Sequence, residues 1–248
     1  MTKEEIEKSY SKRFEEIENM LNFIKKNESK IEPKIKPSDK HTADLKKSLN
    51  IQKASTILLL YNLMESTVSK AFNNIIDDIK DNNVSYTDVS KPFQKIWLNC
   101  NYQDVFDVSA SFKTYKNRTE KILENIFSNE SNESSDFLLF SNLITPWQLT
   151  GGNIETTQIK KLCKNFDVTF NVPQYVSDNA SILIDIKNKR NQLAHGDSSF
   201  EEIGVAITTA DLISWTKEVD AYLKLLIQVT TDFVHEKRYY SRGKVEPI

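Results

Sequence analysis

The side chains best suited to phosphate chemistry lie together near the end of one predicted helix, within Lys187–Gly196. Arg190 supplies a planar guanidinium, whose fixed fork of N–H donors matches phosphate oxygens. His195 supplies an imidazole, a group that titrates near neutral pH and can act as a general acid or base. Gly196 follows directly and predicts that the helix stops there. The stretch therefore indicates a local site for nucleic-acid or nucleotide chemistry.

The helical spacing places Asn191 and His195 on one face, four residues apart, with Lys187 four residues before Asn191. Arg190 is rotated by roughly 100° from Asn191, but its side chain is long enough to reach around the helix. Asn191 is placed to orient His195 or to hold a phosphate oxygen. Cleavage of RNA without a metal needs deprotonation of the ribose 2′-OH and stabilisation of the charge developing on phosphorus. Histidine and arginine can supply these two services.

This chemistry uses an acid as well as a base, and His195 is a single imidazole. Neither His41 nor His235 lies in a comparable pattern. A symmetric homodimer would face two motif helices across a two-fold axis, so that two copies of Arg190 and His195 line one cleft. The residues also have simpler explanations. His195 can be a helix-end histidine near the last carbonyls, and Arg190 can be a solvated surface charge.

Glu65 and the neighbouring lysines are weaker candidates. Glu65 falls on the apolar stripe of the longest predicted helix, where a carboxylate is costly unless it is paired. We expect it either to orient Arg190 or His195 or to lie at the rim of the stripe. Lys187 and Lys189 are typical of a solvated face, although either could add attraction for phosphate.

The segment Lys237–Lys244 interleaves cations with aromatic residues, a pattern that suits single-stranded nucleic acid. Arg238 and Arg242 are its candidate contacts. A frayed basic terminus explains the same residues.

The composition favours a mostly helical protein. The 248 residues include 5 glycines and 6 prolines, and alternating strand patterns do not dominate. The formal net charge of −2 gives no global basic field, so any contact with RNA must be local. Cys100 and Cys163 stand alone, and we expect neither a metal nor another cofactor. No apolar leader or membrane-spanning run is found, which predicts a reduced, cytoplasmic protein without a membrane partner.

Hydrophobic periodicity divides the chain into helices with an irregular middle. The predicted helices cover about 3–27, 41–81, 92–97, 103–127, 156–166, 177–195 and 209–238. A linker is expected over 28–40, a polar loop over 129–136, a short strand over 167–173, and a loop with Phe200 and Gly204 after the motif helix. Thr156 and Thr209 are the expected caps of their helices. The 41–81, motif and final helices are expected to form a bundle, which the first helix or a middle helix completes.

The sequence Arg190–His195 resembles the Arg-polar-x-x-x-His signature of HEPN domains, which are all-α bundles that dimerise. The surrounding sequence is similar to the stand-alone prokaryotic MAE-type branch, on the evidence of Leu59–Glu65 in the long helix and Ser199–Gly204 after the motif. The resemblance covers about residues 45–80 and 177–235. It implies one HEPN-type domain over 1–248, with its core at 41–82 and 176–238, an extra N-terminal helix at 1–27 and an insertion at 84–175.

The same resemblance implies a metal-independent endoribonuclease that acts by 2′-OH attack and leaves a cyclic phosphate. Arg190, Asn191 and His195 would form its site in a homodimer, with Glu65 and Lys187 in support. Such proteins act as toxins or anti-phage effectors, so an antitoxin or a defence-system protein is a further expected partner besides RNA. Two alternatives stay open: a non-catalytic HEPN-type module that binds RNA, nucleotide or protein, and a plain helical scaffold whose motif is only a helix end.

Overall fold

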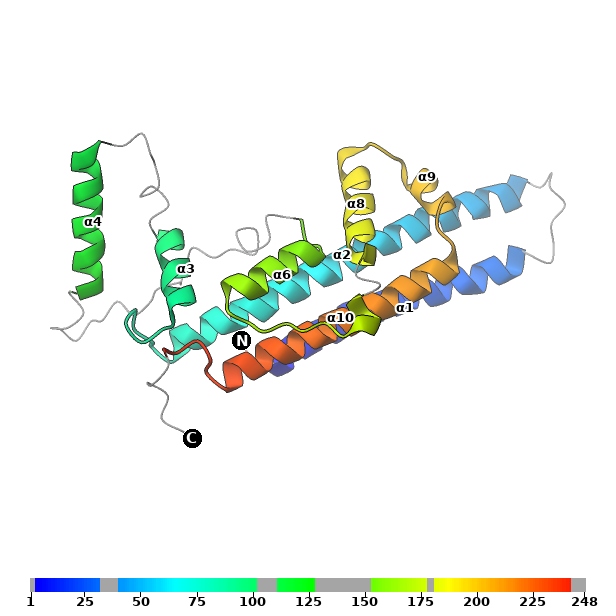
Figure 1. The fold of residues 1–248 in the computed structure, drawn as a ribbon. Helices are drawn as coiled ribbons and strands as arrows, with labels where there is room; N and C mark the ends of the chain where they lie inside the picture. The colour runs from blue at the N-terminus through cyan, green and yellow to red at the C-terminus, as the bar shows by residue number, and fades with distance from the viewer. Residues whose placement is uncertain (1–2, 32–39, 102–110, 128–152, 178–180, 242–248) are drawn as a thin grey trace.

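The computed structural model describes residues 3–31, 40–101, 111–127, 153–177 and 181–241. Within these ranges the chain is helical, and the only strand-like pairing is an isolated antiparallel bridge between Val89 and Tyr240. Three long helices lie side by side and form the body of the molecule: α1 (Lys3–Ile31), α2 (Lys40–Asp81) and α10 (Thr209–His235) (Figure 1). The predicted all-α fold class is confirmed.

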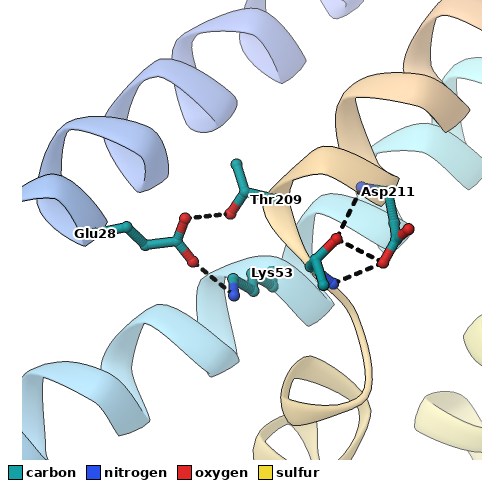
Figure 2. A network of polar contacts seen from close by, with 5 residues as sticks. Glu28, Lys53, Thr209 and Asp211 are labelled. Atoms are coloured by element: carbon teal, nitrogen blue, oxygen red, sulfur yellow. Dashed lines mark hydrogen bonds and ion pairs between the residues drawn. The ribbon is translucent and has the colours of Figure 1, made fainter. Parts of the chain in front are cut away.

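Polar contacts fix the direction of the three long helices. Tyr10 donates to Asp220 at 2.7 Å and Thr209 donates to Glu28 at 2.6 Å, so α10 runs antiparallel to α1. Lys53 of α2 pairs with the same Glu28 at 2.6 Å, and Figure 2 shows this carboxylate joining all three helices. The core between them is built from apolar side chains three or four residues apart, as the periodicity predicts. Its largest fully buried members include Ile17, Ile24, Ile57, Leu60, Phe72 and Phe233.

The helix ends differ from the sequence prediction by a few residues. α1 continues to Ile31, so Glu28 belongs to the helix and not to a linker, while 32–39 lies outside the described residues. α2 stops at the expected place, because Asn83 adopts a left-handed conformation with φ 50°. The Val84 N–H then bonds back to the Ile79 carbonyl at 3.1 Å.

The middle of the chain holds four of the described helices: α3 (Lys91–Asn101), α4 (Phe112–Phe127), α6 (Thr156–Asn165) and α7 (Gln174–Ser177). α4 stands away from the three long helices in Figure 1. The cap of α6 is Glu155 and not Thr156, because the Glu155 carboxylate accepts the Thr157 N–H at 3.1 Å. The predicted loop at 129–136 lies outside the described residues.

The strand predicted over 167–173 is wrong. These residues follow α6 without regular secondary structure, and Val168 and Phe170 pack onto the helical core instead. The Phe170 ring meets the Tyr222 ring edge-on, with centroids 5.3 Å apart. An apolar segment beside helices finds no neighbouring strand with which to share a hydrogen-bond ladder.

The loop predicted around Phe200 and Gly204 is also wrong in part, because it contains the short helix α9 (Phe200–Val205). Ser199 and Glu202 form a capping box that starts this helix. Gly204 lies against the backbone of α2, where an added Cβ would stand 1.9 Å from the Asn50 carbonyl oxygen. Glycine is therefore required for α9 to approach α2 this closely.

The motif helix begins later than expected, and the final helix has another cap and an earlier end. α8 covers Ser181–His195 after the separate α7, and its buried residues are Leu183 and Ile186, whereas Ile182 is half-buried. The cap of α10 is Thr208 and not Thr209, and the helix ends at His235.

Candidate active site

Helix α8 carries the motif and rests on α2 and α10 (Figure 1). Leu183 and Ile186 bury its first half, and the second half projects the polar side chains. The helix ends as the sequence predicts, because Gly196 adopts the left-handed conformation with φ 77°. The Asp197 N–H reaches back to the Gln192 carbonyl at 2.9 Å and satisfies one of the last carbonyls.

Arg190 is held in place by α2 and by its own neighbour. Its guanidinium carbon lies 4.6 Å from the centroid of the Tyr61 ring, a cation–π contact with α2. Its Nη1 donates to Asn191 Oδ1 at 2.9 Å, and Asn191 Nδ2 donates to Asn153 Oδ1 at 3.0 Å. The guanidinium is thus oriented, and within the described residues only one of its five N–H donors is used in a hydrogen bond.

Tyr61 forms the floor beneath Arg190. The residue is 1% exposed, and its hydroxyl accepts the Ile154 N–H at 3.1 Å. Burial raises the pKa of Tyr61, the bond from Ile154 lowers it, the Glu65 carboxylate raises it, and the Arg190 guanidinium lowers it. The phenol therefore stays protonated at neutral pH and offers a neutral aromatic face to the cation.

His195 is exposed at the last position of α8. Five residues along a helix turn the side-chain direction by about 140° and advance it by about 7.5 Å. The His195 side chain therefore leaves the helix in another direction than that of Arg190. In the described part of the chain, no hydrogen bond joins His195 to Arg190. The single chain brings Arg190 and Asn191 together and leaves His195 exposed.

The supporting residues are placed unequally. Glu65 is half-buried on α2 one turn after Tyr61, and it acts electrostatically on the same hydroxyl as Arg190 does. No ion pair joins Glu65 to Arg190 among the described residues. Lys187 and Lys189 are half-buried on α8.

The C-terminal segment differs from its sequence interpretation. Tyr239 is fully buried and donates to Asp78 at 2.6 Å, so its ring is not available for stacking on a base. Arg238 is exposed but pairs with Glu236 at 2.6 Å. The segment is not frayed up to Ser241, while Arg242 lies outside the described residues.

Sequence reasoning missed the parts that hold Arg190. The helical period alone places Tyr61 on the buried stripe of the long helix, and Asn153 and the Ile154 backbone belong to the middle segment. A tyrosine among aliphatic residues signals a hydroxyl in need of a partner. Asn153 carries no comparable signal, because its contact with Asn191 joins residues 38 positions apart.

The described residues contain no group of three or more histidine, cysteine, aspartate or glutamate side chains arranged to hold a metal ion. None of the helices in the described ranges is long and apolar enough to cross a membrane.

A helical bundle that presents an arginine and a histidine five residues apart at the end of one helix is what the HEPN resemblance predicts. The sequence model of the HEPN_MAE_28990-like HEPN family matches residues 2–239, and the chain belongs to this family. The match includes α1 and the middle segment, which the resemblance in the motif region leaves out. Neither a search of curated proteins nor a search of solved structures gave a significant match.

Proposed function

We propose that the protein is an endoribonuclease that cleaves RNA without a metal ion, at a site shared by two copies of the chain. The observation that carries the proposal is the support of Arg190. An arginine that only faces solvent does not require an aromatic ring such as Tyr61 beneath its guanidinium. Nor does it require the hydrogen bonds that link it through Asn191 to Asn153. Fixed donors stabilise a developing charge at little reorganisation cost, which is what a phosphoryl transition state requires.

In this proposal Arg190 binds the scissile phosphate and stabilises its added negative charge. One imidazole removes the proton from the ribose 2′-OH, whose oxygen attacks phosphorus. A second imidazole donates a proton to the departing 5′ oxygen. The products are a 2′,3′-cyclic phosphate and a free 5′-hydroxyl, and no water or metal is consumed in this step.

The direction of His195 supports a homodimer. A single subunit offers one exposed His195 turned away from Arg190, whereas two α8 helices facing across a two-fold axis supply two imidazoles and two guanidinium groups. Asn191 holds Arg190, and Glu65 and Lys187 add to the field around the site.

An assay of RNA cleavage with EDTA present tests the activity. We expect the wild type to cleave, Arg190→Ala and His195→Ala to lose about 100-fold or more in rate, and both variants to keep the wild-type circular dichroism. His235→Ala is the matched control, because His235 is also an exposed histidine at the last position of a helix. Unchanged cleavage in both site variants would leave the non-catalytic binding module as the better account.

Mixed dimers test the shared site. A heterodimer of one Arg190→Ala and one His195→Ala subunit keeps a single arginine and a single histidine. We expect its rate to fall well below that of the wild type, since acid and base can no longer both be supplied. A heterodimer as active as the wild type would show that both copies are not needed.

The proposed biological role is that of a toxin or anti-phage effector, held in check by an antitoxin or a defence-system partner. Such an enzyme stops growth by cutting cellular RNA. Induced expression of the wild type is therefore expected to arrest bacterial growth, and Arg190→Ala is expected to remove the arrest at equal protein level.

A further inference from the structure

We propose that the outer groove between α1 and α2 is a docking site for a partner protein. The groove receives a helix of that partner, with apolar side chains at one end of the helix and carboxylates at the other. The groove is a surface apart from Arg190, and its role in docking does not depend on whether the chain cleaves RNA.

The apolar end of the groove is a hollow of about 580 Å³ between the two helices. Its walls come from both helices, with Met20, Phe23 and Leu59 as the apolar side chains and Glu16, Asn19 and Gln52 as the polar ones. Phe23 is 51% exposed although its side chain is large and apolar. Large apolar side chains gathered in a hollow on the surface are typical of a protein-interaction site.

Gln52 adds a polar group that needs a partner. Its Oε1 is buried and accepts no hydrogen bond from the described residues. A buried acceptor without a donor costs free energy, and the N–H or side-chain donor of a bound segment would satisfy it.

The basic end lies further along the same helix pair. Arg13 and Lys70 both donate to the hydroxyl of Ser9, with the Arg13 bond at 2.8 Å. Two cations therefore share one neutral acceptor, and neither forms an ion pair within the described ranges, although Glu5 acts on Lys70 from a distance. A carboxylate placed between them would gain two charge-assisted hydrogen bonds.

The spacing of the two ends determines the occupant. Ser9 and Phe23 are 14 positions apart on α1, which corresponds to about 21 Å, or roughly four helical turns. A helix of that length laid along the groove puts its apolar side chains on Met20, Phe23 and Leu59 and its carboxylates on Arg13 and Lys70. The apolar walls and the unpaired Gln52 oxygen favour a protein as the ligand. The phosphates of an RNA would contact only the basic end of the groove.

The test uses the full-length protein and two labelled 16-residue helical peptides. One carries leucines at one end and three glutamates at the other, and the second has lysines in place of the glutamates. By fluorescence anisotropy we expect the acidic peptide to bind in the micromolar range, as is usual for short helices, and the basic peptide to bind at least tenfold more weakly.

Variants at the two ends separate the contributions. Phe23→Ser is expected to weaken the acidic peptide about tenfold, and Arg13→Glu to reverse the preference in favour of the basic peptide. The matched controls are Val205→Ser, an exposed apolar residue on α9, and Lys12→Glu, an exposed cation beside Arg13, and neither should change binding.

Three outcomes would overturn the proposal. The first is equal or absent binding of the two peptides. The second is dissociation of a wild-type dimer by Phe23→Ser in sedimentation velocity, which would assign the groove to a second copy of the chain. The third is binding of a labelled RNA oligonucleotide that Arg13→Glu abolishes and that competes with the peptide, which would assign the groove to RNA.

Discussion

Tyr61 shows how one buried side chain can serve both stability and the candidate site. Its ring lies beneath the Arg190 guanidinium, and its hydroxyl accepts the Ile154 N–H. The aromatic face and the hydroxyl are separable by mutation, because phenylalanine keeps the ring and leucine removes both.

Tyr61→Phe is expected to lower the free energy of unfolding by about 1–2 kcal/mol, since the buried Ile154 N–H loses its acceptor. Its RNA cleavage should stay within a few-fold of the wild type. Tyr61→Leu should in addition lose about tenfold in cleavage, which corresponds to a cation–π contact of about 1–2 kcal/mol. Urea denaturation and initial rates measure the two effects. Equal loss of cleavage in both variants would assign the role to the hydroxyl.

At the scale of elements, two glycines illustrate two different requirements. Gly204 is needed for space, because a Cβ would stand 1.9 Å from the Asn50 carbonyl oxygen of α2. Gly196 is needed for its backbone conformation, with φ 77°, and has open space around it.

Gly204→Ala is therefore expected to lower the free energy of unfolding by about 3 kcal/mol or more, since α9 must move away from α2. Gly196→Ala should lower the free energy of unfolding by about 1 kcal/mol, because alanine is disfavoured in the left-handed conformation. Thermal or urea unfolding of the two variants measures the difference. Equal losses would contradict the close packing of α9 on α2.

The capping boxes of α9 and α10 give the fold a dependence on pH. The backbone and side chain of Ser199 donate to Glu202 at 2.7 and 2.8 Å and lower its pKa. The side chain and backbone of Thr208 do the same for Asp211, at 2.7 and 2.9 Å. A lowered folded-state pKa means that the stabilisation is present above the unfolded-state value, near pH 4, and is lost as pH falls through the folded-state value.

The Tm of the double variant Glu202→Gln, Asp211→Asn should accordingly fall less than the Tm of the wild type when the pH is lowered from 6 to 3. Differential scanning calorimetry over this range measures it. Glu4→Gln, an exposed carboxylate in the first turn of α1, serves as the control and should follow the wild type. An unchanged pH dependence in the double variant would mean that these caps do not contribute to acid lability.

The elements that the sequence predicts well are those in which local pattern and packing agree. The stripe of α2 and the Gly196 stop belong to this group, because period and left-handed glycine act within a few residues. The composition of 167–173 alone predicts a strand, but the segment packs against helices and does not form one. The bond between Asn153 and Asn191, which holds Arg190 in turn, could not be predicted, since it depends on where the chain returns after the middle segment.

At the scale of the whole molecule, the C-terminal residues close the bundle onto the end of α2. Tyr239 is fully buried and its hydroxyl donates to Asp78, while burial and that carboxylate raise the pKa of Tyr239. Ser90 N–H donates to the Tyr239 carbonyl at 2.8 Å, and Ser241 N–H donates to the Asp88 carbonyl at 2.7 Å. The basic and aromatic pattern of this segment thus contains a structural tyrosine.

Two truncations separate this structural role from a role in binding RNA. Ending the chain after Glu236 removes Tyr239 and its bonds, and should lower the free energy of unfolding by more than about 3 kcal/mol, as for loss of a buried aromatic side chain. Ending it after Ser241 keeps these contacts and should leave stability unchanged, while a contribution of Arg242 to RNA would appear as weaker binding alone. Urea denaturation and RNA titration at fixed salt measure the two quantities. A stable chain ending at Glu236 would show that the segment does not hold the bundle closed.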